Sequence, residues 1–195
     1  MEKFLILKPF MQTLAEGKTF KNFFYWFLRI IAVITLLGFI YLSVKLWANI
    51  PFSEIEVSVI IFALLAQVLF ALLVFVICNI LLIRADDFKT LNTSQDYILI
   101  PITVRFIRIT GEITGVFYAF IGIFTGIAIW TVGPMMRSLS STIPGMDLFS
   151  GNTGIAGGFI AIIGGPLFGF MMLCLQYLIA EILQMLADYF RNTRR

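Results

Sequence analysis

Four long apolar runs divide the chain, and shorter polar segments separate them. The runs cover residues 23–50, 55–83, 113–133 and 154–180. A helix that rises 1.5 Å per residue needs about 20 apolar residues to cross the hydrocarbon core of a bilayer. Each run reaches that length, so we expect an all-α integral membrane protein with four transmembrane helices.

The segments at the two ends of this four-helix domain have a mixed character. Residues 1–22 alternate lysines with apolar side chains, which predicts a short interfacial amphipathic segment before a four-helix transmembrane domain at 23–195. The fourth helix can continue to about residue 190, which is longer than a bilayer needs, so its last turns should project beyond the membrane. The connection at 135–153 contains apolar residues and is expected to rest on the opposite membrane surface.

The distribution of Lys and Arg predicts the orientation of the spans. On the side of the amino terminus, 12 basic residues occur: Lys3, Lys8, Lys18, Lys21, Arg29, Arg84, Lys89, Arg105, Arg108, Arg191, Arg194 and Arg195. The other side has two, Lys45 and Arg137. Basic residues accumulate on the cytoplasmic side of membrane proteins. We therefore expect both termini to be cytoplasmic.

Composition narrows the chemistry that this protein can perform. The 195 residues are 60% hydrophobic and 13% charged, and the chain contains no histidine and two cysteines, each inside an apolar run. Without histidine it lacks the commonest general base and metal ligand. No nucleotide-binding or nucleophile motif occurs. We expect no catalytic residue, no metal or other cofactor, no nucleic-acid partner and no soluble substrate.

Glycines recur at helical spacing in the last two spans. Such stripes of small residues let helix backbones approach closely in a membrane, where packing replaces the hydrophobic drive. In the third span they are Gly111, Gly115, Gly122, Gly126 and Gly133, and in the fourth span Gly157, Gly158, Gly164, Gly165 and Gly169. The two stripes could pack on each other within one chain, or one of them could dock a neighbouring subunit as a glycine zipper.

Two further features lie inside the spans. Gln67 is near the centre of the second span and is expected to form an interhelical hydrogen bond. Pro166 follows two glycines near the middle of the fourth span, where a proline bends a helix. Such a break could improve packing, or it could help to build a transport site at the membrane midplane.

Two stretches resemble a family of small bacterial membrane proteins that carry a domain of unknown function. One is Tyr25-Trp26 after the lysine-rich start, and the other is Gly165-Pro166-Leu167 followed by Tyr177-Leu178-Ile179-Ala180-Glu181. The resemblance covers about a third of the chain, and the family has two spans where this chain has four. It implies a bacterial plasma membrane protein and no particular activity.

These patterns favour a non-catalytic integral subunit whose partners are the lipid bilayer and other membrane chains, identical or different. In this hypothesis the glycine faces pack in a homo-oligomer or a larger membrane complex. The alternative hypothesis is a small channel or transporter component that uses the proline-broken fourth helix.

Overall fold

The computed structural model describes residues 18–48, 57–90, 99–133 and 154–193. It contains four long helices: α2 (Lys18–Ala48), α3 (Val57–Lys89), α4 (Leu99–Val132) and α6 (Ile155–Thr193). All four are long and apolar enough to cross a membrane. The chain is therefore a multi-pass, all-α membrane protein with four candidate spans, and this prediction is confirmed.

The helices are longer than the apolar runs that predicted them. Residues 18–22 belong to α2, and α3 continues through the polar residues Arg84 to Lys89. No glycine or proline interrupts the end of α3, and Arg84 forms an ion pair with Asp87 one turn later, which suits a helix. Residues 1–17 and the connection at 135–153 lie outside the described residues.

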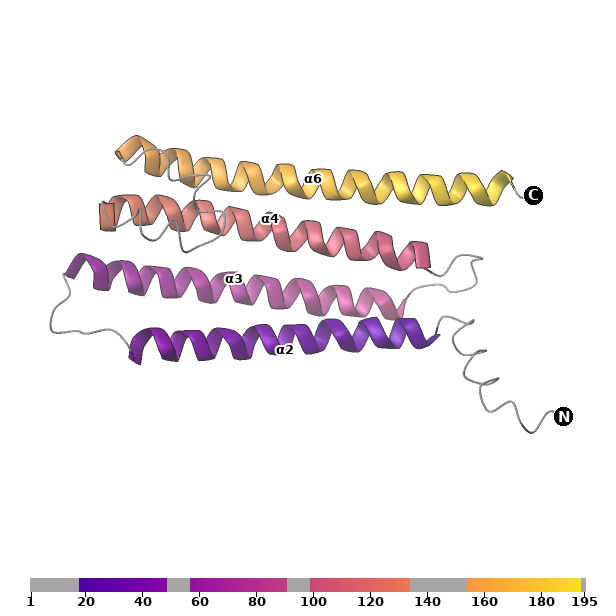
Figure 1. Ribbon diagram of the computed structural model, residues 1–195, viewed down its shortest axis with the longest axis horizontal. Helices are drawn as coiled ribbons and strands as arrows, with labels where there is room; N and C mark the ends of the chain where they lie inside the picture. The colour runs from indigo at the N-terminus through magenta and orange to yellow at the C-terminus, as the bar shows by residue number, and fades with distance from the viewer. Residues whose placement is uncertain (1–17, 49–56, 91–98, 134–153, 194–195) are drawn as a thin grey trace.

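The four helices form an open row in chain order (Figure 1). Among the described residues, helix backbones approach one another closely only between α2 and α3, between α3 and α4, and between α4 and α6. As a result, α2 and α6 are the two edges of the row. In the most apolar stretch of each helix, 39% of the residues of α4 are buried, compared with 11% in α2. The inner helix α4 is thus the centre of the packing.

The beginning of α2 and the end of α6 lie at the same end of the row (Figure 1). We call it the basic end, because its described side chains include Lys21, Arg29, Arg84, Lys89, Arg105 and Arg108. The sequence count placed these residues together on one side of the membrane. The basic residues that the count assigns to one side of the membrane thus lie at one end of the row.

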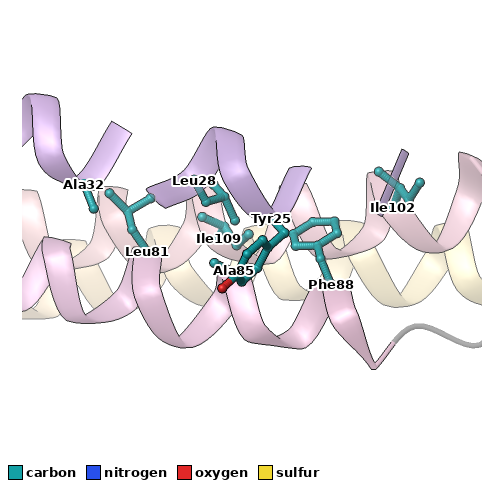
Figure 2. Packing of buried hydrophobic residues seen from close by; sticks show 8 residues of the cluster. All are labelled: Tyr25, Leu28, Ala32, Leu81, Ala85, Phe88, Ile102 and Ile109. Atoms are coloured by element: carbon teal, nitrogen blue, oxygen red, sulfur yellow. The ribbon is translucent and has the colours of Figure 1, made fainter. Parts of the chain in front are cut away.

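A small hydrophobic core joins three helices near the basic end. Figure 2 shows its side chains pointing toward one another from α2, α3 and α4: Tyr25, Leu28, Ala32, Leu81, Ala85, Phe88, Ile102 and Ile109. Phe88 is fully buried, and its ring stacks on Phe24 with centroids 5.5 Å apart. This core fixes the end of α3 against α4, and so positions the charged residues that both helices carry there.

Candidate functional site

The glycine stripe of α4 faces α6 within the same chain. A Cβ atom added at Gly115 would lie 3.0 Å from the carbonyl oxygen of Gly169. One added at Gly122 would lie 2.6 Å from the carbonyl oxygen of Ala161 and would also collide with the backbone of Gly165. These two helix backbones are therefore in direct contact, which only residues without side chains permit.

The remaining glycines of the two stripes differ in their surroundings. Added Cβ atoms at Gly111, Gly126, Gly158 and Gly169 would also meet atoms of the facing helix, whereas none of the described atoms lies within 4 Å of one at Gly133. Gly157 is buried and Gly164 is half-buried. Of the two alternatives that the sequence left open, the described structure has the intrachain contact.

Gln67 connects α3 to α2. Its Nε2 donates a hydrogen bond to the Oγ of Ser43, at 2.7 Å.

Replacing Gln67 with leucine should lower the free energy of unfolding by about 0.6 kcal/mol, the average for such bonds in a membrane. Unfolding in mixed detergent micelles, followed by circular dichroism, measures this loss. The Ser43→Ala variant should lose a similar amount, and combining the two should add little, because both remove the same bond.

Pro166 lies inside a continuous α6, and the preceding Gly165 packs on Gly122. A proline in a helix removes one backbone hydrogen bond, and close packing against a neighbouring helix can offset that loss. The described part of α6 thus contains no pair of half-helix ends such as those that bind ions in transporters.

An ionic network near the basic end ties three helices together. Arg84 of α3 donates from Nε to Oε2 of Glu112 on α4, at 2.9 Å, and its Nη2 contacts Oε1 of the same carboxylate. The Tyr177 hydroxyl of α6 donates to Glu112 Oε1 at 2.6 Å. The Glu112 side chain is only 14% exposed. A buried carboxylate needs such partners, and here both come from neighbouring helices.

Arg84 also forms an ion pair with Asp87. Its Nη1 donates to Oδ2 of Asp87 at 2.7 Å, so both nearby carboxylates are bound by one guanidinium. Both carboxylate oxygens of Glu112 and Oδ2 of Asp87 are used for this pairing. In the described part of the chain, no three His, Cys, Asp or Glu side chains gather in a way that could hold a metal ion.

Beside this network lies a partly open cavity of about 200 Å³. Its lining consists of Arg84, Asp87, Phe88, Arg105, Arg108 and Ile109. The Arg105 guanidinium lies 6.0 Å from the centre of the Phe88 ring. The Arg108 guanidinium lies 5.6 Å from the centre of the Tyr177 ring and donates to Gln184 Oε1 at 3.4 Å. Three arginines from two helices therefore converge on one cavity.

The position of Trp130 in α4 indicates the depth of this cavity in the membrane. Trp130 and Arg108 are 22 residues apart, which corresponds to about 33 Å along a helix. Tryptophan prefers the membrane interface, and the hydrocarbon core is about 30 Å thick. With Trp130 at one interface, Arg108 and the cavity reach the headgroups of the opposite leaflet.

Part of this site follows from the sequence. Arg105, Arg108 and Glu112 are spaced i, i+3 and i+7, which puts them on one face of a helix, but this spacing does not indicate their partners on α3 and α6. The available signal is that Arg84 follows the second apolar run and Glu112 precedes the third, so both lie on the same side of the membrane. Opposite charges at one depth in neighbouring antiparallel helices are candidates for a pair.

The four apolar helices and their polar connections define the class of this chain, a multi-pass α-helical membrane protein. No protein-family model, curated protein or solved structure matches it. Its function has to be inferred from its own residues.

Proposed function

We propose that the chain is a non-catalytic integral membrane subunit that assembles with other membrane chains in a homo-oligomer or a larger complex. The observation that carries this proposal is the end of α6, whose last turns project beyond the other three helices (Figure 1). We call residues 182–193 the α6 extension; it includes these turns and the preceding turn, in which Gln184 still contacts Arg108 of α4. Its exposed apolar side chains are Ile182, Met185, Leu186, Tyr189 and Phe190.

These five residues follow the spacing i, i+3, i+4, i+7 and i+8, which puts them along one face of the helix. Met185 is 71% exposed and Tyr189 is 66% exposed. The polar residues Glu181, Gln184 and Asp188 lie on another face. Amphipathic helices of this kind bind by laying the apolar face into a groove or against a partner helix.

The depth of the α6 extension argues that lipid tails do not cover this face. Gln176 packs against Gly111 of α4 and is 14 residues before Phe190, about 21 Å along a helix. Gly111 is 19 residues from Trp130, so it lies near the edge of the hydrocarbon core when Trp130 is at the other edge. The interfacial region adds only about 5–8 Å on each side. The last turns of α6 thus extend past the headgroups and offer their apolar face to another protein.

The open row supports the same proposal. The glycine stripes of α4 and α6 face each other within the chain, so the α6 extension, rather than those stripes, is the surface that we assign to a partner.

We place the protein in the plasma membrane, with the basic end in the cytoplasm, because the 12-to-2 distribution of Lys and Arg favours that orientation. The partner surface is then on the cytoplasmic side.

The proposal predicts that the full-length protein extracted in a mild detergent migrates as a complex larger than one chain. The variant carrying Met185→Glu and Tyr189→Glu puts two charges on the apolar face and should release a folded single chain. Truncating residues at the centre of an interface typically costs 2 kcal/mol or more, so affinity should fall by about thirtyfold or more. Size-exclusion chromatography with light scattering gives the mass, and mass spectrometry identifies the other chains.

The matched control is Asn192→Glu, which adds a charge to the same helix end without removing an apolar side chain. It should leave the complex intact. Recovery of the unmodified protein as a single chain in mild detergent and in lipid nanodiscs would contradict the proposal. A single chain that also conducts ions in liposomes would favour a channel or transporter component instead.

A further inference from the structure

Among the described residues, no ion pair joins Arg105 or Arg108 to an acidic side chain, although the Asp87 carboxylate acts electrostatically on Arg105. The carboxylates of Asp87 and Glu112 are both bound by Arg84. Arg108 donates to a neutral amide, that of Gln184. Arg84 with its two carboxylates has a net charge of −1, and Arg105 and Arg108 add two positive charges, so the site has one net positive charge.

Part of the Arg105 guanidinium and part of the Arg108 guanidinium are also withdrawn from water. Nη1 of Arg105 and Nε of Arg108 are buried and have no hydrogen-bond partner among the described residues. Burying a charged donor without a partner is costly, because its hydration is lost and nothing replaces it. An anion in the cavity would balance the net positive charge of the site, which gives such a ligand a driving force to bind.

The shape and depth of the cavity indicate the kind of anion. Its volume of about 200 Å³ is below the roughly 300–1,000 Å³ of sites for drug-sized molecules, so it suits a compact group. The planar guanidinium matches the oxygens of a phosphate, and the rings of Phe88 and Tyr177 hold the two guanidiniums in place. With Trp130 at the opposite interface, the cavity lies at the level of the phospholipid headgroups.

We propose that this cavity binds a phosphate group, and that the group belongs to an anionic phospholipid of the leaflet at the basic end. Arg105 and Arg108 hold the phosphate, while Arg84 remains paired with its two carboxylates and closes one wall. The bound phosphate lies between α3 and α4, next to the network that Tyr177 extends to α6. Arg108 touches the α6 extension through Gln184, which lies on its polar face, but no apolar side chain of that extension lines the cavity. The lipid site therefore does not depend on the proposed assembly.

The test uses the full-length protein in micelles that contain equal amounts of phosphatidylglycerol and phosphatidylcholine. Native mass spectrometry should show preferential retention of phosphatidylglycerol, because the choline cation would face the arginines. In the double variant Arg105→Gln, Arg108→Gln, affinity for phosphatidylglycerol should fall by about thirtyfold, or about fivefold for each arginine near the membrane surface. The matched control Lys21→Gln removes a charge of the basic end outside the cavity and should keep the preference.

Two further measurements keep the test decisive if the double glutamine variant does not fold. Replacing phosphatidylcholine with phosphatidylglycerol should raise the unfolding temperature of the unmodified protein. The double variant Arg105→Lys, Arg108→Lys keeps both charges but loses the planar donors, and it should lose part of the preference.

The source of the phosphate is resolved by adding inorganic phosphate to phosphatidylcholine micelles, with chloride at equal ionic strength as the reference. Preferential retention of phosphatidylglycerol that the folded glutamine variant loses supports the lipid. Stabilisation by inorganic phosphate without any lipid preference supports phosphate binding and overturns the lipid as its source. Equal retention of the two lipids with no effect of inorganic phosphate overturns the proposal.

Discussion

Replacing Gly122 with leucine should separate α4 from α6 and lower the free energy of unfolding by about 3 kcal/mol or more. A Cβ at this position would already collide with the backbone of Gly165 and lie 2.6 Å from the carbonyl oxygen of Ala161. Backbone atoms cannot move aside as a flexible side chain can, so overpacking here should cost at least the usual 1–3 kcal/mol. Unfolding in mixed detergent micelles measures the change.

Gly38→Leu on α2 is the matched control. None of the described atoms lies within 4 Å of a Cβ at Gly38, and leucine is the better helix former, so this variant should be neutral or more stable by up to about 1 kcal/mol. If Gly122→Leu instead left the single chain fully stable and only dissociated a complex, the glycine stripe of α4 would be a face for a partner, and the intrachain contact would be wrong.

Replacing Glu112 with alanine should lower the free energy of unfolding by about 2 kcal/mol. Breaking a fully buried ion pair costs roughly 3–5 kcal/mol, but the Arg84 side chain is 31% exposed and keeps Asp87, so part of that cost is avoided. Tyr177 loses its acceptor at the same time. Unfolding in mixed micelles is again the measurement, with circular dichroism to show that the helices remain.

A double-mutant cycle shows whether the pair itself is responsible. The combined variant Arg84→Met, Glu112→Leu removes both charges and should be less destabilised than the sum of the two single changes, because apolar residues can replace a buried pair. The exposed pair of Arg29 and Asp86 is the comparison: the Asp86 side chain is 63% exposed, so Asp86→Asn should cost less than about 1 kcal/mol. Strict additivity of the Arg84 and Glu112 changes would argue against their coupling.

The number and character of the helices could be predicted from the sequence because a bilayer imposes a simple requirement. A run of about 20 apolar residues has few alternatives to a spanning helix, since lipid offers no partner to free backbone groups. The helix ends were harder to predict. Residues 18–22 and the turn from Arg84 to Lys89 are polar enough to resemble connections, yet they continue α2 and α3, because a helix need not stop where its apolar residues do.

The candidate sites could be predicted only in part. Helical spacing identified the glycine stripes and the face that carries Arg105, Arg108 and Glu112, because spacing depends on one helix at a time. The partners of these residues come from other helices. Nothing in the spacing of α4 indicates that Glu112 meets Arg84 and Tyr177, which are 28 and 65 residues away in the chain.

The sequence by itself determined that this chain has four membrane helices, that its basic residues gather at one end, and that α4 and α6 each carry a glycine stripe. These are properties of local composition and of a single helical period. The tertiary structure decided that the two glycine stripes meet within one chain, that α2 and α6 are the two edges of an open row, and that three arginines line one cavity. Such contacts depend on the relative rotation and register of separate helices, which packing sets only once the helices meet.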